Sequence, residues 1–442
     1  MMTFIDGNSE CPFDLLTSLD MQIKQEVFGK ILSLLDLSVL ETMESEVAKA
    51  QIADLCGKLL NEQSRPINSK VRKILIKLII DEILGLGPLE TLLEDPSIAD
   101  ILINRYDSIY VERRGKLERV SVQFYDNKHL LNIIDRIVSS VGRRVDESSP
   151  MVDARLKDGS RVNAIIPPLA LDGPILSIRR FTVDKLTAEQ LIDYGAMSRD
   201  MGELIKAAVT GKLNVLISGG TGSGKTTLLN ILSGYIPENE RIITIEDSAE
   251  LQLQQPHTVR LETRPANIEG KGEISQRDLV KNCLRMRPDR IVIGEVRGAE
   301  AIDMLAAMNT GHEGSMTTLH ANSARDALSR LENMICMGGF DMPIHNIRAQ
   351  ICSAINLVIQ LQRQEDGGRR ITSIQEINGM EGDIISMSEI FRFSREDKNE
   401  QGQIIGHFEA TGVIPVFHRQ LIRKGIHLPY SIFGVDSSAP GF

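Results

Sequence analysis

The sequence predicts a protein of the α/β class, with a mostly parallel sheet in its second half and a smaller α+β domain before it. Three observations predict this fold. From about residue 187 onward, short apolar runs alternate with helical patterns. One of these runs, 215–217, leads through a glycine-rich turn into a helix. Residues 96–185 instead carry short strands separated by turns, with a single amphipathic helix over 130–142.

The alternation in the second half predicts a sheet with helices on both faces, because each strand–helix–strand crossover returns to the same sheet. In such sheets, ligands bind at the carboxyl ends of the strands. Strands are expected over 213–218, 241–246, 291–294, 315–319 and 356–361. Helices are expected over 201–211, 276–286, 298–309 and 324–337.

The remaining segments complete a division into five parts. Apolar residues at helical spacing predict a helical extension, followed by a helical block that ends near a Gly-Leu-Gly-Pro turn. The polar tail is expected to add strands and a short helical end to the preceding domain. The expected parts are 1–62 (helical extension), 63–95 (helical bundle segment), 96–185 (α+β domain), 186–362 (the parallel-sheet domain) and 363–442 (C-terminal appendage).

The glycine-rich turn has the spacing of a phosphate-binding P-loop, Gly219-x4-Gly224-Lys225-Thr226, between a strand and a helix. Backbone N–H groups of such a loop surround phosphate oxygens, and the helix N-terminus adds positive charge. Lys225 is expected to reach the β- and γ-phosphates, and Thr226 to ligate Mg²⁺. A chance Lys-Thr after a glycine turn would lack this strand–helix context. The expected nucleotide-binding residues are Gly219, Gly220, Thr221, Gly222, Ser223, Gly224, Lys225, Thr226 and Thr227.

Acidic residues end two further predicted strands. Glu295 ends the apolar run that starts at Arg290, and Glu246 with Asp247 ends the run over 242–245. Two carboxylates beside one phosphate site can serve as a metal partner and as a general base. For Glu246 and its neighbours, an alternative role in helix capping stays open.

Two histidines and a group of arginines are weaker candidates. His312 and His320 stand at the two ends of one predicted strand, where they could sense a γ-phosphate or orient an acid. Their surroundings lack the spacing of a metal site. Arg161 and Arg179 lie in the α+β domain together with other arginines; they form either a solvated basic face or phosphate contacts across a domain cleft or a subunit boundary.

Composition limits the classes of function. The net charge is −10 and the pI is about 5.5, with no Trp and 6 Tyr. A protein that coats nucleic acid usually carries a basic domain and aromatic stacking residues, so nucleic acid is not an expected partner. The five cysteines are scattered, and neither a signal sequence nor a long uncharged apolar segment is recognisable. We therefore expect a cytoplasmic protein that is at most peripheral to a membrane.

Four motifs in order resemble those of the hexameric ATPases of the type II/IV secretion superfamily. They are the P-loop, an Asp box around Glu246, a Walker B strand ending at Glu295, and a His box from 311 to 322. Within the superfamily, the sequence resembles most closely the Tad/Flp pilus assembly ATPases (the CpaF/TadA family). The stretches that carry this resemblance are 89–104, 161–168, 254–257, 264–272, 285–290 and 377–383.

The resemblance implies a RecA-like P-loop NTPase domain and the roles of its site residues. By this resemblance, Glu246 would be the base for water and Glu295 would support Mg²⁺, or these two roles would be exchanged. His312 and His320 would link nucleotide state to domain position, and Arg161 and Arg179 would face the nucleotide. Thr318 departs from the family pattern, in which Gly is frequent at that position.

The resemblance also implies a homohexamer that hydrolyses ATP with Mg²⁺ and drives pilus assembly through inner-membrane platform proteins, at the inner face of that membrane. One alternative is the ATPase of a type IV secretion or conjugation machine, with the same chemistry and a different cargo. A DNA-stimulated RecA-like motor is a further alternative, which the acidic pI disfavours.

Overall fold

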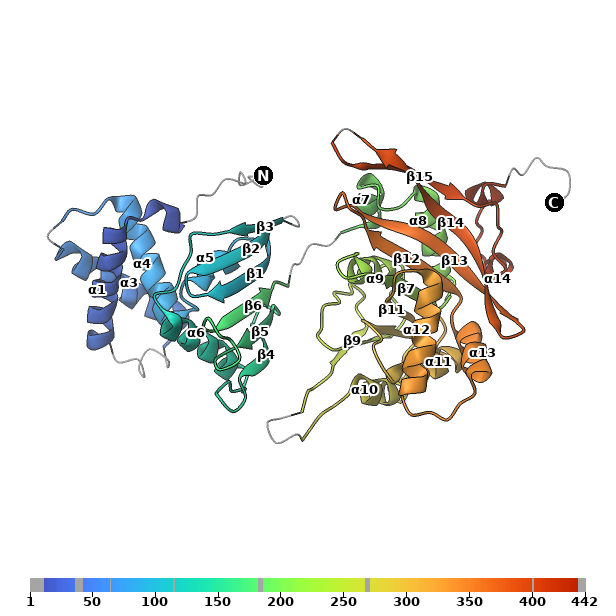
Figure 1. Cartoon of the computed structure of the whole chain (residues 1–442), viewed down its shortest axis with the longest axis horizontal. Coiled ribbons are helices and arrows are strands. Elements are labelled where there is room, and N and C mark those ends of the chain that lie inside the picture. The colour runs from blue at the N-terminus through green and yellow to red at the C-terminus, as the bar shows by residue number, and fades with distance from the viewer. Residues whose placement is uncertain are drawn as a thin grey trace. The chain divides into compact units, whose positions relative to one another are not determined.

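The structure, a computed structural model, describes residues 12–35, 43–63, 65–113, 116–181, 186–266, 271–399 and 401–435. The start of the predicted helical extension (1–11), the segment 36–42 within it and part of the stretch 264–272 lie outside these residues. Contacts divide the chain into two compact units, 1–183 and 184–442. Figure 1 shows the first unit in blue to green and the second in green to red. The finer division into five parts stays a prediction.

Three helices of the first unit, α1, α3 and α4, form a bundle, because their apolar faces share one core. Val27, Ile52 and Leu75 come from three different helices and are fully buried in that core. A helix near the sheet, α6, begins at the side-chain cap Asp126, which accepts a hydrogen bond from the backbone N–H of His129. The helical elements of this unit are η1 (Pro12–Leu15), α1 (Ser18–Leu34), α3 (Ser45–Asn61), α4 (Ser69–Leu84), α5 (Leu89–Leu93) and α6 (Asn127–Ser140).

The sheet of the first unit is antiparallel throughout, in the order β3-β2-β1-β6-β5-β4. Ile101 and Ile103 of β1 lie on its buried face, as the two-residue period of a strand requires, and pack in one core with Ile134 of α6. The strands are β1 (Ile98–Arg105), β2 (Ser108–Arg113), β3 (Lys116–Arg119), β4 (Met151–Arg155), β5 (Arg161–Ile165) and β6 (Ile175–Arg179).

The second unit is built on a sheet ordered β15-β14-β13-β12-β7-β11-β10-β8-β9. Neighbours from β12 to β9 are parallel, whereas β12 to β15 are joined by antiparallel pairs. The parallel part confirms the predicted α/β fold. The strands are β7 (Val215–Gly219), β8 (Ile242–Glu246), β9 (Thr258–Glu262), β10 (Arg290–Ile293), β11 (Met316–His320), β12 (Leu357–Arg363), β13 (Arg369–Glu381), β14 (Ile384–Lys398) and β15 (Ile404–Ala410).

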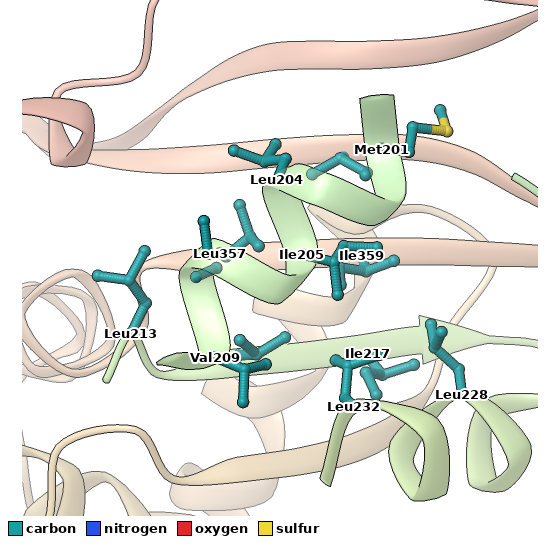
Figure 2. Close-up of a cluster of buried hydrophobic side chains, with 14 of the residues drawn as sticks. Met201, Leu204, Ile205, Val209, Leu213, Ile217, Leu228, Leu232, Leu357 and Ile359 are labelled. Atoms are coloured by element: carbon teal, nitrogen blue, oxygen red, sulfur yellow. The ribbon is translucent and has the colours of Figure 1, made fainter. Parts of the chain in front are cut away.

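Two apolar cores cover the two faces of this sheet. In one of them, shown in Figure 2, Leu204 and Ile205 of α8 and Leu228 of α9 pack against strand residues such as Ile217 and Ile359. The other core joins α10, α11, α12 and α13 to the opposite face. The helical elements are α7 (Ala188–Asp193), α8 (Arg199–Thr210), α9 (Lys225–Ser233), α10 (Gln276–Cys283), α11 (Glu300–Asn309), α12 (Ala324–Met337), α13 (Ile344–Ala354), α14 (Phe417–Arg423) and η2 (Tyr430–Phe433).

Candidate active site

The P-loop connects the buried strand β7 to α9, and its backbone requires glycine at two positions. Gly222 has φ 68° and Gly224 has φ 95°, values that side chains with a Cβ rarely adopt. The Ser223 hydroxyl donates to the carbonyl of Gly220 at 2.9 Å, which closes the turn on itself. Because α9 begins at the next residue, its unpaired backbone N–H groups and its dipole are available to an anion.

Lys225 lies against the loop that precedes it. Its Nζ donates to the carbonyls of Gly219 at 3.0 Å and Gly220 at 2.9 Å. Partial burial lowers the pKa of Lys225, the charge of Glu295 acts in the opposite direction, and the charge of Arg297 lowers it further. Carbonyl oxygens are weaker partners for an ammonium group than phosphate, so this side chain can transfer to a phosphate bound in the loop. The glycine conformations and the lysine together fit a nucleoside polyphosphate.

The sheet order brings the other candidate residues to the same edge. Strands β8, β10, β11 and β7 are parallel neighbours, so their carboxyl ends lie side by side. His320, the last residue of β11, pairs in register with Gly219. Glu246 ends β8, and Glu295 follows β10 by two residues. A Cβ added at Gly294 would lie 3.0 Å from the Cγ of Glu246, so the two acidic strand ends are in contact.

The carboxylate of Glu246 is almost fully buried, and only one of its two oxygens accepts hydrogen bonds from described residues. Its Oε2 accepts from the backbone N–H of Glu250 at 2.7 Å and of Leu251 at 2.8 Å. Its Oε1 is buried and has no hydrogen-bond partner among the described residues. Burial raises the pKa of this carboxyl, although the two backbone N–H groups oppose the shift. The capping role and the catalytic role are therefore compatible, because one oxygen holds the 247–251 loop and the other can accept a proton or bind water.

Glu295 is held by Arg297, a residue that the sequence analysis missed. The Oε2 of Glu295 accepts from Nε of Arg297 at 2.9 Å and from Nη2 at 2.6 Å. The Nη1 of Arg297 donates to Oδ2 of Asp247 at 3.1 Å. This guanidinium therefore bridges the two acidic strand ends. The sequence gives one signal for Arg297, a basic residue two positions after the acid that ends a strand. That signal does not reveal Asp247, the second partner of Arg297, which follows another strand.

The structure separates the two candidate histidines. His320 stands beside the P-loop, but His312 precedes β11, at the end of the strand that pairs with Val215 rather than with Gly219. His312 is within hydrogen-bond distance of the carbonyl of Ala307, at 3.3 Å from its Nδ1. The parallel register thus places His312 before the amino-terminal end of β11 and His320 at its carboxyl end, beside Gly219. The roles predicted for both histidines stay predictions.

Arg161 and Arg179 belong to the first unit, where they face each other. They are register partners on the antiparallel pair β5–β6, so their side chains share one face of that sheet. Burial raises the pKa of Asp100, the register partner of Arg179 on β1, and the charge of Arg179 opposes that shift. Whether the two arginines reach a nucleotide stays a prediction.

A resident metal cage of protein side chains is not found among the described residues, because no three His, Cys, Asp or Glu side chains gather at metal-binding distance there. A nucleotide-associated Mg²⁺ needs few protein ligands, since phosphate oxygens and water fill most positions. Thr226 at the start of α9 and the carboxylate of Glu295 are donors of the kind that such an ion prefers. No helix within the described ranges is long and apolar enough to cross a membrane.

A parallel sheet with a P-loop at its carboxyl edge, and with acidic strand ends beside that loop, defines a P-loop nucleotide hydrolase. Comparison with known proteins identifies the family within this class. The chain matches the family of type II/IV secretion system proteins over residues 82–383, which is more than half of its length. The chain belongs to this family, and it is an ATPase.

Individual relatives agree with the family. A putative conjugal transfer protein of Mycobacterium tuberculosis is 38% identical over 315 residues, which cover 70% of this chain and 89% of that protein. The conjugal transfer protein TrbB of Rhizobium radiobacter is 30% identical over 65% of this chain and 86% of its own length. Among solved structures, the VirB11 ATPase of the Brucella suis type IV secretion system is 29% identical and covers 65% of this chain and 92% of its own, with a TM-score of 0.36. Because that TM-score is low, the family assignment rests on the sequence match.

Proposed function

We propose that this protein is the ATP-driven motor of a secretion machine in the cell envelope, and that type IV secretion or conjugal transfer is the first candidate process. The observation that carries this proposal is the match to a putative conjugal transfer protein, of which 89% is covered at 38% identity. The match to the conjugal transfer protein TrbB supports the same process. The candidate active site supplies the chemistry that a motor of this kind needs.

In this proposal, ATP binds with its phosphates in the P-loop and with Mg²⁺ held by Thr226 and Glu295. The free oxygen of Glu246, which is buried and unpartnered among the described residues, accepts a proton from the attacking water. Attack of that water on the γ-phosphorus breaks the bond to the β–γ bridging oxygen and gives ADP and inorganic phosphate. Release of the phosphate then removes negative charge that Lys225 neutralises. In the proposal, this loss of charge at the P-loop changes the position of the first unit, which carries Arg161 and Arg179.

Assembly into a homohexamer, with inner-membrane platform proteins as partners, belongs to the same proposal. Arg161 and Arg179 lie on a unit other than the one that carries the P-loop. A neighbouring subunit can therefore supply them, and a closed ring gives every P-loop the same neighbour. Electron microscopy of the ATP-bound particle tests this part, since a monomeric particle under conditions of full turnover would exclude it.

Assembly of a Tad/Flp pilus is the second candidate process. The stretches 161–168 and 285–290, together with the others named for the resemblance, favour it over a general secretion role. Both processes use the same ATPase chemistry, so the active site does not separate them. A DNA-stimulated motor remains a distant third, because the net charge is −10.

A deletion of the gene in its host separates the candidates. The deletion strain, and the strain complemented with wild-type protein or with Lys225→Ala, are assayed for conjugal transfer, for secreted proteins and for surface pili. Loss of transfer or secretion with intact pili supports the first candidate. Loss of pili alone supports the second, and normal behaviour in all three assays contradicts a motor function. In vitro, many-fold stimulation of ATP hydrolysis by DNA would favour the third.

A further inference from the structure

The path of the chain after β12 carries it past the P-loop. Strand β12 pairs in parallel with β7, and Leu361 stands opposite Gly219, where the P-loop begins. A Cβ added at Gly219 would lie 2.7 Å from the carbonyl oxygen of Leu361, so the two backbones are in close contact. Two residues further along the chain is Arg363, which ends β12.

A second arginine stands opposite the first. Arg369, the first residue of β13, is the antiparallel register partner of Arg363, so both side chains lie on one face of the hairpin. A Cβ added at Gly222 would lie 3.6 Å from Nη1 of Arg363. A Cβ added at Gly224 would lie 3.7 Å from Cδ of Arg369. Arg363 therefore lies next to Gly222, and Arg369 next to Gly224, the two P-loop glycines that have positive φ.

The hairpin does not neutralise these two charges. Its acidic residues are engaged elsewhere, Glu365 with Lys398 at 2.5 Å and Asp366 with Arg370 at 3.1 Å. Within the described part of the chain, no ion pair involves Arg363 or Arg369. Two like charges directly opposite each other on a strand pair are destabilising. The fold keeps them together beside a lysine and a helix N-terminus, an arrangement that is stabilised when a multiply charged anion binds.

We propose that Arg363 and Arg369 bind the phosphate chain of the nucleotide from the same subunit that supplies the P-loop. This inference rests on the proposed nucleotide site and extends it with a pair of ligand-binding residues that no motif of the sequence contains. A planar guanidinium can donate two parallel N–H bonds to one phosphate group, a bidentate geometry that the ammonium group of a lysine does not offer. The pair distinguishes nucleotides by phosphate content and differs from Arg161 and Arg179, which lie on the first unit.

Nucleotide binding by the full chain tests the proposal. Arg363→Ala, Arg369→Ala and Arg363→Lys are compared with wild type by the affinity for a fluorescent ADP analogue, and by competition with ATP, ADP and adenosine. Each alanine variant is expected to weaken ADP and ATP binding about tenfold, as for loss of a charge-assisted hydrogen bond, and to leave adenosine competition unchanged. The lysine variant is expected to recover part of the loss.

Arg395→Ala is the matched control, because Arg395 lies on the adjacent strand β14 and its guanidinium pairs with Glu365 at 3.6 Å. It is expected to bind ADP as wild type does. Unchanged ADP affinity in both Arg363→Ala and Arg369→Ala would overturn the inference while leaving the nucleotide site intact. If the wild type itself bound no nucleotide, or if Lys225→Ala bound it normally, the underlying site assignment would fail instead.

Mixing two impaired variants tests whether the arginines act within one subunit. Arg363→Ala/Arg369→Ala protein is mixed with Lys225→Ala protein under conditions that exchange subunits, and ATP hydrolysis is measured at an ATP concentration that does not saturate the double variant. If the arginines serve the P-loop of their own subunit, no complete site can form and activity does not rise above that of the double variant alone. Recovery of activity on mixing would show that they serve a neighbour, which contradicts the proposal.

Discussion

Glu246 and Glu295 are adjacent carboxylates with different surroundings, and these surroundings suggest different roles. Glu295 is partly exposed and bound to the guanidinium of Arg297, at 2.6 Å from Nη2. Glu246 is buried, holds the following loop with one oxygen and leaves the other unpartnered among the described residues. An ionised carboxylate in such a buried position is a strong proton acceptor. We therefore propose Glu246 as the general base and Glu295 as the residue that supports the metal.

The first prediction concerns Glu246→Gln, which we expect to abolish turnover while ATP remains bound. Burial raises the pKa of Glu246 in the folded protein above that in the unfolded chain. The free energy of unfolding therefore falls as pH rises from the usual carboxyl pKa through the raised pKa. Glutamine removes this cost and can still accept from the backbone N–H groups of Glu250 and Leu251. The variant should have a Tm close to that of wild type at pH 4 and a higher Tm at pH 7 to 8. Thermal unfolding over this pH range checks the sign, and an equal difference at all pH values would contradict it.

The second prediction concerns Lys225→Ala. The P-loop carbonyls hold the ammonium group of Lys225 in place. When ATP binds, this group is expected to contact the γ-phosphate and neutralise part of its charge. We expect turnover below detection and nucleotide affinity reduced at least about tenfold. Lys206→Ala, an exposed position on α8 of the same unit, serves as the control and should hydrolyse ATP normally. A Lys225→Ala protein with wild-type turnover would remove the basis of the P-loop assignment.

At the scale of elements, a fully buried arginine ties together four segments of the second unit. Arg290 begins β10 and is completely inaccessible to solvent. Its Nε donates to Glu240 at 2.5 Å, and its Nη1 donates to the carbonyls of Val209 at 2.8 Å and Gly314 at 3.2 Å. These bonds connect the end of α8, the loop before β8 and the loop before β11 at the sheet edge opposite the P-loop.

The third prediction uses two glycines of the loop before β11. Gly314 has φ 79°, and a Cβ there would lie 2.2 Å from Nη1 of Arg290. Gly311 has φ 93° and no atom within 4 Å of an added Cβ. Gly311→Ala should cost about 1 kcal/mol in backbone strain, and Gly314→Ala roughly 2 kcal/mol more because a buried guanidinium must move. Urea unfolding of both variants measures the difference, and equal costs would contradict the proposed role of Arg290.

The fourth prediction concerns the attachment of the N-terminal helices. Lys24 of α1 and Glu82 of α4 form an ion pair at 2.8 Å that is almost fully buried, and Glu82 also lies 2.9 Å from Nε2 of His129. Burial alone would raise the pKa of Glu82, but His129 and Lys24 hold it below the usual value. The stabilisation by this carboxylate is therefore present above its usual pKa and is lost as pH falls through the lowered value.

Lys24→Met leaves the Glu82 charge buried with one partner fewer, so we expect a loss of about 3 kcal/mol in unfolding free energy at pH 7. Lys49→Met removes an exposed pair with Glu46 and should leave stability unchanged. The difference between the variants should shrink at acid pH, where Glu82 becomes protonated. Denaturant unfolding at two pH values measures it, and a difference that grew on acidification would argue against a charged Glu82.

At the scale of the whole molecule, the fifth prediction addresses the arginines of the first unit. If Arg161 and Arg179 stabilise charge in the transition state, Arg161→Ala and Arg179→Ala should lower kcat at least about 100-fold and change ADP affinity little. Arg119→Ala, on β3 at the far edge of the same sheet, is the control and should leave kcat unchanged. Wild-type kcat in both arginine variants would mean that they form a solvated basic face.

Local patterns were sufficient to predict most of the parallel strands and their helices. Runs such as 242–245 and 291–293 are buried in the centre of the sheet, where both faces are covered and apolar residues predominate, so the run itself marks the strand. Strand β9 was missed because it lies at the sheet edge, with no fully buried residue. The length and pairing of β14 were not predicted either, because most of its side chains are partly or fully exposed.

By itself, the sequence determined the P-loop, the acidic strand ends and the family, because each depends on residues that are close neighbours in the chain. The tertiary structure decided which distant groups meet. Parallel register placed His320 beside Gly219 and His312 at the other edge, and strand order let Arg297 bridge Glu295 to Asp247. Antiparallel register set Arg363 against Arg369 beside the P-loop glycines. Such contacts arise from strand pairing, which no local pattern of residues specifies.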